Sequence, residues 1–415
     1  MRRRLPEVLR VRDYTLSIGS SVSYGFGREM VFVAVGWQVY DISKDPLDLG
    51  LIGLAEFLPL PLLALPAGQL ADRLSRRLVF AVALALDVVL AAALIVVTVE
   101  DVQSIWPYLG VAFLSGVGGA IGWPAARALA PTLVPPDLLA TALAYRSIAM
   151  QGATVAGPAI GGLLFVVSPV IPYATAVGLF VVALLCVLAL HEGRDPAEAT
   201  DAPGLEGLFD GLRFVRDTPI LLGAISLDLF AVLFGGAVAL LPVFASSILD
   251  VGPVGLGILR SAPAVGALIA GLLIARRPIG GMAGRKLLVA VGVFGLSMVV
   301  FGLSRSFALS CLALAVSGFV DMISMNIRST TVALATPNEL RGRVNAVEMV
   351  FISASNELGA FESGLAASFL GATRAVVLGG VATIGIAVGW ARLFPPLARV
   401  DRLEEVRPEP APASL

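Results

Sequence analysis

Long, uninterrupted apolar runs constrain this chain more than any other feature of its sequence. A helix needs about 20 apolar residues to cross a hydrocarbon core of roughly 30 Å, whereas a membrane β-barrel shows short segments of alternating polarity. Charged residues, Pro and Gly bound twelve suitable runs: residues 15–41, 48–71, 78–99, 106–133, 139–167, 171–190, 219–245, 253–275, 286–304, 307–334, 342–369 and 373–394. The chain is therefore predicted to be an all-α integral membrane protein with 12 transmembrane helices.

Composition agrees with a membrane protein and argues against several other classes. Hydrophobic residues make up 57% and charged residues 14% of the 415 residues, and the mean hydropathy of +0.90 lies outside the range of soluble globular proteins. Cys186 and Cys311 lie inside apolar runs without CxxC spacing, and GxSxG, GxxxxGK and paired histidines are missing from the sequence. We therefore expect that the protein is not an enzyme and has no cofactor or metal site. The net charge of −1 gives no indication of nucleic-acid binding.

Basic residues gather on alternate loops, which predicts the orientation of the chain. One side has little beyond Lys44, Arg305 and Arg374. The other side collects Arg2, Arg3, Arg4, Arg10, Arg12, Arg73, Arg76, Arg77, Arg194, Arg213, Arg216, Arg276, Arg277, Arg285, Lys286, Arg341, Arg343, Arg399, Arg402 and Arg407. By the positive-inside rule the rich side is cytoplasmic, so both termini are expected in the cytoplasm and the protein in a bacterial inner (plasma) membrane.

An internal repeat predicts two similar halves. The sequence PDLLAT at residues 136–141 recurs about 200 residues later as PNELRG at residues 337–342, each time between the fourth and fifth helix of a half. Parallel repeats of this kind are typical of transporter folds with a path between the halves. The predicted domains are an N-terminal half (1–190), a cytoplasmic linker (191–217) with a short amphipathic helix around 205–215, a C-terminal half (218–396) and a cytoplasmic tail (397–415).

The loop after the second run has the sequence GQLADRLSRR at residues 68–77. It resembles the signature loop of the major facilitator superfamily, G-x-L-a-D-R-x-G-R-R, with Ser75 in place of the usual second Gly. The resemblance implies the major facilitator fold, in which two six-helix halves surround a central cavity in a chain that is usually monomeric. It also implies a gating role for Gly68, Asp72, Arg73, Arg76 and Arg77. The alternative is a generic basic turn.

The fifth run contains GPAIGG at residues 157–162, which is similar to the GPxxGG motif of the exporters of this superfamily. The resemblance implies that Gly157, Pro158, Gly161 and Gly162 shape the path of an exporter, because Gly allows close helix approach and Pro a bend. The alternative is that these residues only pack helices tightly in a carrier that works in another direction.

Further stretches resemble the bacterial group that includes the enterobactin exporter and related drug:proton antiporters. They are residues 227–230 (LDLF), 235–236 (GG), 240–242 (LLP), 336–337 (TP), 341–344 (RGRV) and 355–359 (SNELG). Many proton antiporters have an arginine in the fourth helix, near the position that Ala112 occupies here. This chain lacks that arginine, so the resemblance does not imply that it couples transport to protons in that way.

Ionisable side chains inside the predicted helices are candidate functional residues, because each costs roughly 2.5–3.5 kcal/mol at a helix centre and so usually faces the protein interior or a cavity. Our first candidates for proton coupling are Asp228 and Glu357, with Arg260 as a possible counter-charge. Asp321 and Arg328 share a helix face about two turns apart, so each is expected to pair across helices. The remaining candidates for proton or substrate binding are Arg28, Glu29, Glu56 and Asn356. Each could instead belong to a fixed ion pair that holds helices together.

These features predict a secondary active exporter that moves a small amphipathic organic molecule, siderophore or drug-like, outward in exchange for protons. The expected partners are a small-molecule substrate and the lipid bilayer, and the expected coupling ion is the proton. A carrier of lysophospholipid or of a metal ion with the same fold is the nearest alternative, and a non-transporting membrane sensor is an alternative from another class.

Overall fold

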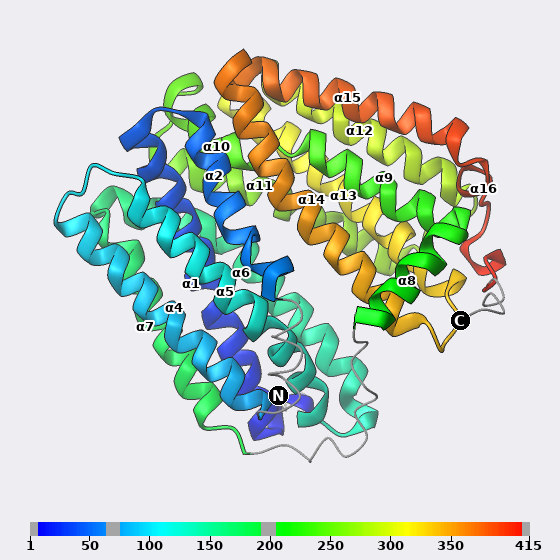
Figure 1. Cartoon of the computed structure of the whole chain (residues 1–415), viewed down its shortest axis with the longest axis horizontal. Coiled ribbons are helices and arrows are strands. Elements are labelled where there is room, and N and C mark those ends of the chain that lie inside the picture. Colours follow the sequence, from blue (N-terminus) through cyan, green and yellow to red (C-terminus); the bar gives the residue numbers. More distant parts are fainter. Residues whose placement is uncertain (1–6, 64–74, 192–204, 409–415) are drawn as a thin grey trace, which may run out of the picture. The chain divides into compact units, whose positions relative to one another are not determined.

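A computed structural model of the chain describes residues 7–63, 75–191 and 205–408, and the regular structure in these ranges is helical (Figure 1). The long helices are α1 (Arg12–Ser43), α2 (Pro46–Phe57), α4 (Arg76–Val99), α5 (Trp106–Leu129), α6 (Leu139–Val167), α7 (Val170–Leu188), α8 (Leu205–Asp217), α9 (Pro219–Gly235), α11 (Gly252–Arg276), α12 (Ala283–Leu303), α13 (Phe307–Ala335), α14 (Arg341–Leu370) and α15 (Ala372–Leu393). Shorter elements are η1 (Glu7–Arg10), η2 (Ala130–Leu133), η3 (Pro136–Leu138), η4 (Val238–Leu240), α10 (Leu241–Val243), the π-helix η5 (Phe244–Ile248), α16 (Pro395–Ala398) and η6 (Leu403–Glu405).

Each of the twelve apolar runs contains a helix, and α6 has the predicted bounds. The amphipathic segment of the linker forms α8, two residues longer than expected. The C-terminal end of the second run lies outside the described residues.

The seventh run departs from the prediction because it is not one continuous helix. Helix α9 ends at Gly235, and Gly236 is extended with φ −78° and ψ 92° before the chain continues through η4, α10 and η5. The hydroxyl of Ser363 on α14 donates to the carbonyl oxygen of Gly236 at 2.8 Å. This bond satisfies a carbonyl that the break removes from the helix ladder, which the membrane interior requires.

Ten of the described helices are long and apolar enough to cross a membrane by length and composition. Helices α1 and α14 are not among them, although they have 32 and 30 residues. Both are rich in ionisable side chains, including Arg28 and Glu29 on α1 and Glu348, Glu357 and Glu362 on α14. Their length suits a span, and their charges lower their mean hydropathy.

An exposed apolar stripe on α4 fits contact with lipid. Val82, Val89 and Val96 follow one another at seven-residue intervals and are 60–63% exposed. Residues seven apart lie on the same helix face. A continuous apolar face of this kind is stable against hydrocarbon but unfavourable in water.

The chain divides into two compact units. Unit 1 comprises Met1–Lys44, Ala55–Ala202 and Val251–Ser261, and unit 2 comprises Asp45–Leu54, Pro203–Asp250 and Ala262–Leu415. The beginning of α2 thus belongs to unit 2 and the beginning of α11 to unit 1. The half boundaries predicted from the repeat stay a prediction.

The core of unit 1 lies where α4, α5 and α7 meet, around the buried side chains of Phe80, Leu84, Leu129 and Val187. Helix α1 packs against α6 and α7 in the same unit. The core of unit 2 has two clusters: Leu227 and Leu287 join α9 to α12, and Phe214, Leu221 and Val344 join α8, α9 and α14. These cores fix the helices that position the charged groups described next.

Candidate functional site

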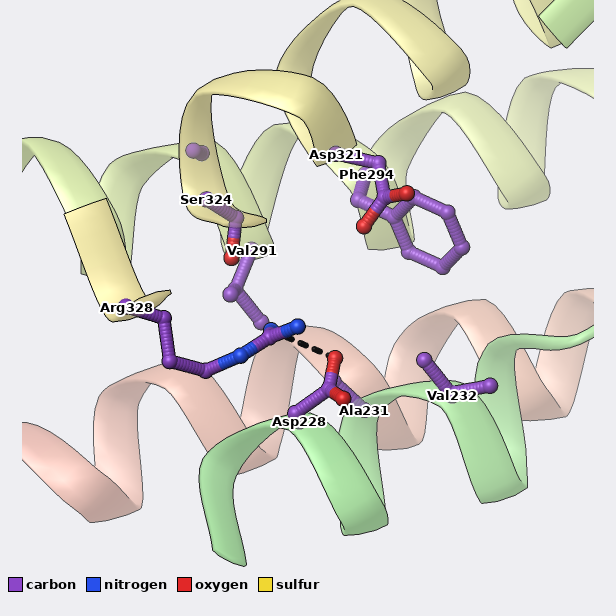
Figure 2. A pocket seen from close by; sticks show the side chains of 9 residues that line it. Asp228, Ala231, Val232, Val291, Phe294, Asp321, Ser324 and Arg328 are labelled. Carbon is purple, nitrogen blue, oxygen red and sulfur yellow. Dashed lines mark hydrogen bonds and ion pairs between the residues drawn. The ribbon is translucent and has the colours of Figure 1, made fainter. Parts of the chain in front are cut away.

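A buried ion pair joins two helices of unit 2. Nη1 of Arg328 on α13 lies 2.5 Å from Oδ1 of Asp228 on α9. Figure 2 marks this pair with a dashed line. Both residues are buried, with 6% and 7% of their surface exposed. Because an unpaired charge inside a membrane protein is very costly, each of these groups stabilises the other.

Asp321 lines the same pocket as this pair. The pocket is a small cavity of about 20 Å³ bounded by α9, α12 and α13. Residues 321, 324 and 328 lie on one face of α13, because their spacing of three and four matches the helix repeat. The lining is otherwise apolar apart from Ser324, with Ala231, Val232, Ala290, Val291 and Phe294 as the other members.

The charges in this pocket do not balance. Two carboxylates, those of Asp228 and Asp321, line the pocket together with one guanidinium, that of Arg328. In the described structure Arg328 pairs with Asp228, and Asp321 has an exposed side chain. The pocket can therefore accept one further positive charge, either a proton on a carboxylate or a cationic group of a ligand.

A second charged cluster lies in unit 1. Nη2 of Arg28 on α1 is 3.0 Å from Oε1 of Glu56 on α2, and the Arg28 guanidinium carbon lies 4.6 Å from the centre of the Trp123 ring. The indole Nε1 of Trp123 donates to the hydroxyl of Tyr24 at 3.4 Å. Arg28 is thus held by a carboxylate and an aromatic face together, an arrangement that suits a guanidinium.

The neighbouring residue on α1 makes a separate pair. Nε of Arg260 on α11 lies 3.3 Å from Oε2 of Glu29, and its guanidinium carbon lies 3.7 Å from the centre of the Phe32 ring. Arg260 therefore is not the counter-charge of Asp228 that the sequence suggested. Arg328 has that role, because helix packing in unit 2 places it against Asp228 while Arg260 is engaged in unit 1.

Glu357 is also separate from the pocket. It lies half-buried on α14, where its carboxylate faces Gly53 of α2, and it is not among the residues that line the pocket of unit 2. The adjacent Asn356 is exposed, and its side-chain amide donates to the carbonyl oxygen of Ile352 on its own helix at 2.9 Å. The two first candidates from the sequence, Asp228 and Glu357, thus occupy different environments.

The signature loop is described only at its end. Gly68, Asp72 and Arg73 lie outside the described residues, while Arg76 begins α4. Arg77 donates through Nε to the carbonyl oxygen of Val187 at 3.1 Å and through Nη2 to that of Leu188. A basic side chain at the last carbonyls of α7 is favourable because the C-terminal end of a helix carries partial negative charge.

Ser75, the departure from the usual Gly of the loop, has a local role. Its hydroxyl accepts the backbone N–H of Leu78 at 3.2 Å, which makes it the N-cap of α4. The sequence alone shows only that Ser75 replaces the usual second Gly of the signature loop. The cap supplies a physical reason for a serine there.

The four residues of the GPxxGG motif lie on α6 and allow close packing. A Cβ atom at Gly157 would lie 2.8 Å from Cβ of Glu29, and one at Gly161 would lie 2.9 Å from Cα of Met30. Pro158 and Gly162 are buried on the same helix, and Gly162 is in close contact with the backbone of Pro253. Helix α1, which holds Arg28 and Glu29, is thus seated directly on this motif.

Tyr24, Phe32 and Ser324 belong to these clusters and were not expected from the sequence. Tyr24 and Phe32 lie four residues before and after Arg28 on α1, so the helical repeat places them near it. Ser324 lies between Asp321 and Arg328. Spacing on the helix was the available signal, but aromatic and hydroxyl residues are too common in membrane helices for that spacing to select them.

Sequence similarity to known proteins extends over most of the chain. Residues 14–413 match the family model described as transmembrane secretion effector. Macrolide efflux protein A of Streptococcus pyogenes is 23% identical over 398 residues, covering 91% of this chain and 95% of that protein. Multidrug efflux pump Tap of Mycolicibacterium fortuitum is 28% identical over 393 residues, covering 89% and 94%. Enterobactin exporter EntS of Escherichia coli O81 (strain ED1a) is 25% identical over 329 residues, covering 79% and 78%.

Solved structures show the same fold. A bacterial homologue of the lysosomal transporter Spinster matches with a TM-score of 0.74 at 16% identity, covering 98% of this chain and 100% of that chain. A mutant of the nucleoside transporter NupG matches with a TM-score of 0.71 at 13% identity, covering 92% and 100%. The family model, which spans nearly the whole chain, and this fold together place the protein in the transmembrane secretion effector family of the major facilitator superfamily, a family of multi-pass membrane transporters and not of enzymes.

Proposed function

We propose that this protein is a secondary active exporter that moves a small amphipathic organic molecule, siderophore or drug-like, out of a bacterial cell in exchange for protons. It works by alternating access in the inner membrane, with both termini in the cytoplasm. The observation that carries the proposal is the pocket of unit 2, which is lined by two carboxylates, Asp228 and Asp321, and by one guanidinium, that of Arg328, which pairs with Asp228.

The charge imbalance supports proton coupling. Arg328 neutralises one carboxylate, so the second is charged and uncompensated unless it takes a proton or meets a cationic ligand. Asp321 is the group that takes the proton, because Asp228 is buried against Arg328 while Asp321 has an exposed side chain in the pocket. A proton and a cargo that both need this site exclude each other, which is the requirement for antiport.

The cargo class is supported by the relatives. Three of them are named for efflux of macrolides, efflux of multiple drugs and export of enterobactin, and the alignments with the first two cover more than nine-tenths of those proteins. All three cargo types are organic molecules with polar and apolar parts. The orientation is supported by the positive-inside rule: arginines stand at the beginning of α4, α12 and α14, and loops rich in arginine remain in the cytoplasm.

The test is cargo-dependent proton movement in proteoliposomes that contain a pH-sensitive dye. The cargo panel includes a catecholate siderophore, a macrolide, other cationic drugs, a lysophospholipid and divalent metal ions. Wild type is compared with Asp321→Asn, Asp228→Asn and Glu357→Gln. The matched control is Asp137→Asn, which makes the same chemical change at an exposed position in η3, at the very beginning of a spanning segment and away from the pocket lining.

We expect cargo-dependent proton flux in wild type and Asp137→Asn, and its loss in Asp321→Asn with binding of the cargo retained. Flux that persists in Asp321→Asn and stops in Glu357→Gln would move the coupling site to α14. Flux driven only by lysophospholipid or metal would establish the carrier alternative. Absence of flux with every compound, from correctly folded protein, would contradict export and favour the sensor.

A further inference from the structure

Helix α8 is 13 residues long, and one of its faces is buried while the opposite face is exposed. On one face Phe214 and Val215 are 1% and 2% exposed and pack into the cluster with Leu221 and Val344. Gly211 on that face is in close contact with the backbone of Arg343. This face fixes α8 to unit 2.

The opposite face is exposed and combines apolar with basic side chains. Phe209 and Leu212 are 62% and 40% exposed, and Arg213 and Arg216 are exposed beside them. The four positions are spaced by three, one and three residues, so they form a single stripe along the helix. We define these four residues as the outer stripe of α8.

The arginines of the outer stripe are available to a ligand. Among the described residues, neither Arg213 nor Arg216 lies within ion-pair distance of a carboxylate, whereas the nearby Asp210 pairs with Arg343 at 2.9 Å. The exposed apolar surface of Phe209 and Leu212 is unfavourable in water, whereas the arginines beside it bind anions. They suit a surface that offers hydrocarbon and negative charge together.

The position of α8 indicates which surface that is. Only Thr218 separates the end of α8 at Asp217 from the start of α9, a spanning helix. The helix therefore lies at the boundary of the membrane and not in bulk water. Figure 1 shows α8 beside the beginning of α14, where Asp210 of α8 pairs with Arg343.

We infer that the outer stripe of α8 is a binding site for anionic phospholipid of the inner leaflet. Phe209 and Leu212 enter the boundary between headgroups and acyl chains, and Arg213 and Arg216 bind headgroup phosphates. The site depends on the orientation of the chain but not on the cargo or the coupling ion, so it stands apart from the proposed transport function.

The first experiment counts bound lipid. Full-length protein in mixed micelles is titrated with phosphatidylglycerol in a phosphatidylcholine background, and the retained lipid is measured by native mass spectrometry. Each basic side chain near an anionic surface contributes about fivefold in affinity. We expect Arg213→Gln/Arg216→Gln to weaken retention of phosphatidylglycerol by about 25-fold and to leave phosphatidylcholine unchanged. The comparison variant, Arg276→Gln/Arg277→Gln, removes two exposed arginines, one at the end of α11 and one directly after it, and so controls for general surface charge; the inference requires a clearly smaller loss of phosphatidylglycerol there than in the α8 variant.

The second experiment locates the stripe. Phe209→Cys is introduced into a Cys186→Ala/Cys311→Ala background, labelled with a fluorophore, and reconstituted in vesicles of phosphatidylglycerol and phosphatidylcholine. Quenching by brominated acyl chains is the result expected of a stripe in the bilayer interface. Quenching by iodide alone would place it in water, and quenching by neither would mean that protein covers it. Either of those results, or equal lipid retention by all variants, overturns the inference.

Discussion

At the level of single residues, the buried ion pair between Arg328 and Asp228 gives the first prediction. Replacing Arg328 by Gln leaves Asp228 buried without its partner, which typically costs about 3–5 kcal/mol. We expect Arg328→Gln to lower the thermal unfolding temperature clearly, and the double variant Arg328→Gln/Asp228→Asn to recover most of the loss. Unfolding of the purified proteins in one detergent measures this. A single variant as stable as wild type would mean that Asp228 is not held as the structure shows.

Ser75 gives a second prediction at this level. Its hydroxyl caps α4, so Ser75→Ala should destabilise the protein by about 1 kcal/mol, whereas Ser75→Gly should have an effect several times smaller. Thermal unfolding of the two variants distinguishes loss of the N-cap hydrogen bond from loss of side-chain volume at this position. Equal effects of Ala and Gly would speak against the cap.

The sequence could predict which residues belong to the candidate site, but not which of them pair with one another. The cost of a charge in the membrane selected Asp228, Asp321 and Arg328, which the structure brings together in one pocket. It could not identify which arginine faces Asp228, because Arg328 is 100 positions away and pairing is set by helix packing. The sequence therefore suggested Arg260, which instead pairs with Glu29.

At the level of elements, the GPxxGG motif sets the distance between α1 and α6. A methyl group at Gly161 would lie 2.9 Å from the backbone of Met30, so Gly161→Ala forces the helices apart. Overpacking of this kind costs about 1–3 kcal/mol.

Gly152 offers the matched control on the same helix. A methyl group there meets nothing within 4 Å, so Gly152→Ala should be neutral or slightly stabilising. Thermal unfolding and yield of folded protein measure both variants. Equal stability of Gly161→Ala and wild type would show that α1 and α6 are not in close contact at this point.

Helix positions followed from the sequence because hydrophobicity at the length of a bilayer is a strong and local signal. The break after α9 could not be predicted from the sequence, although Gly235, Gly236 and Pro242 all lie in the apolar run 219–245. Gly and Pro are frequent in spanning helices that remain continuous. Whether they interrupt one depends on partners from elsewhere in the chain, here the hydroxyl of Ser363.

At the level of the whole molecule, we propose that a proton gradient drives export. Inside-out proteoliposomes load the cargo into the lumen when the protein runs as an exporter, so an acidic lumen should drive uptake against a concentration gradient. The decisive experiment measures uptake of radiolabelled cargo under an imposed pH gradient, with and without nigericin, and compares it with uptake under an imposed sodium gradient at equal pH. We expect uptake above equilibrium that nigericin abolishes, that a sodium gradient does not replace, and that Asp321→Asn lacks. Uptake that follows the sodium gradient, or that stops at equilibrium under every gradient, would contradict proton-coupled export.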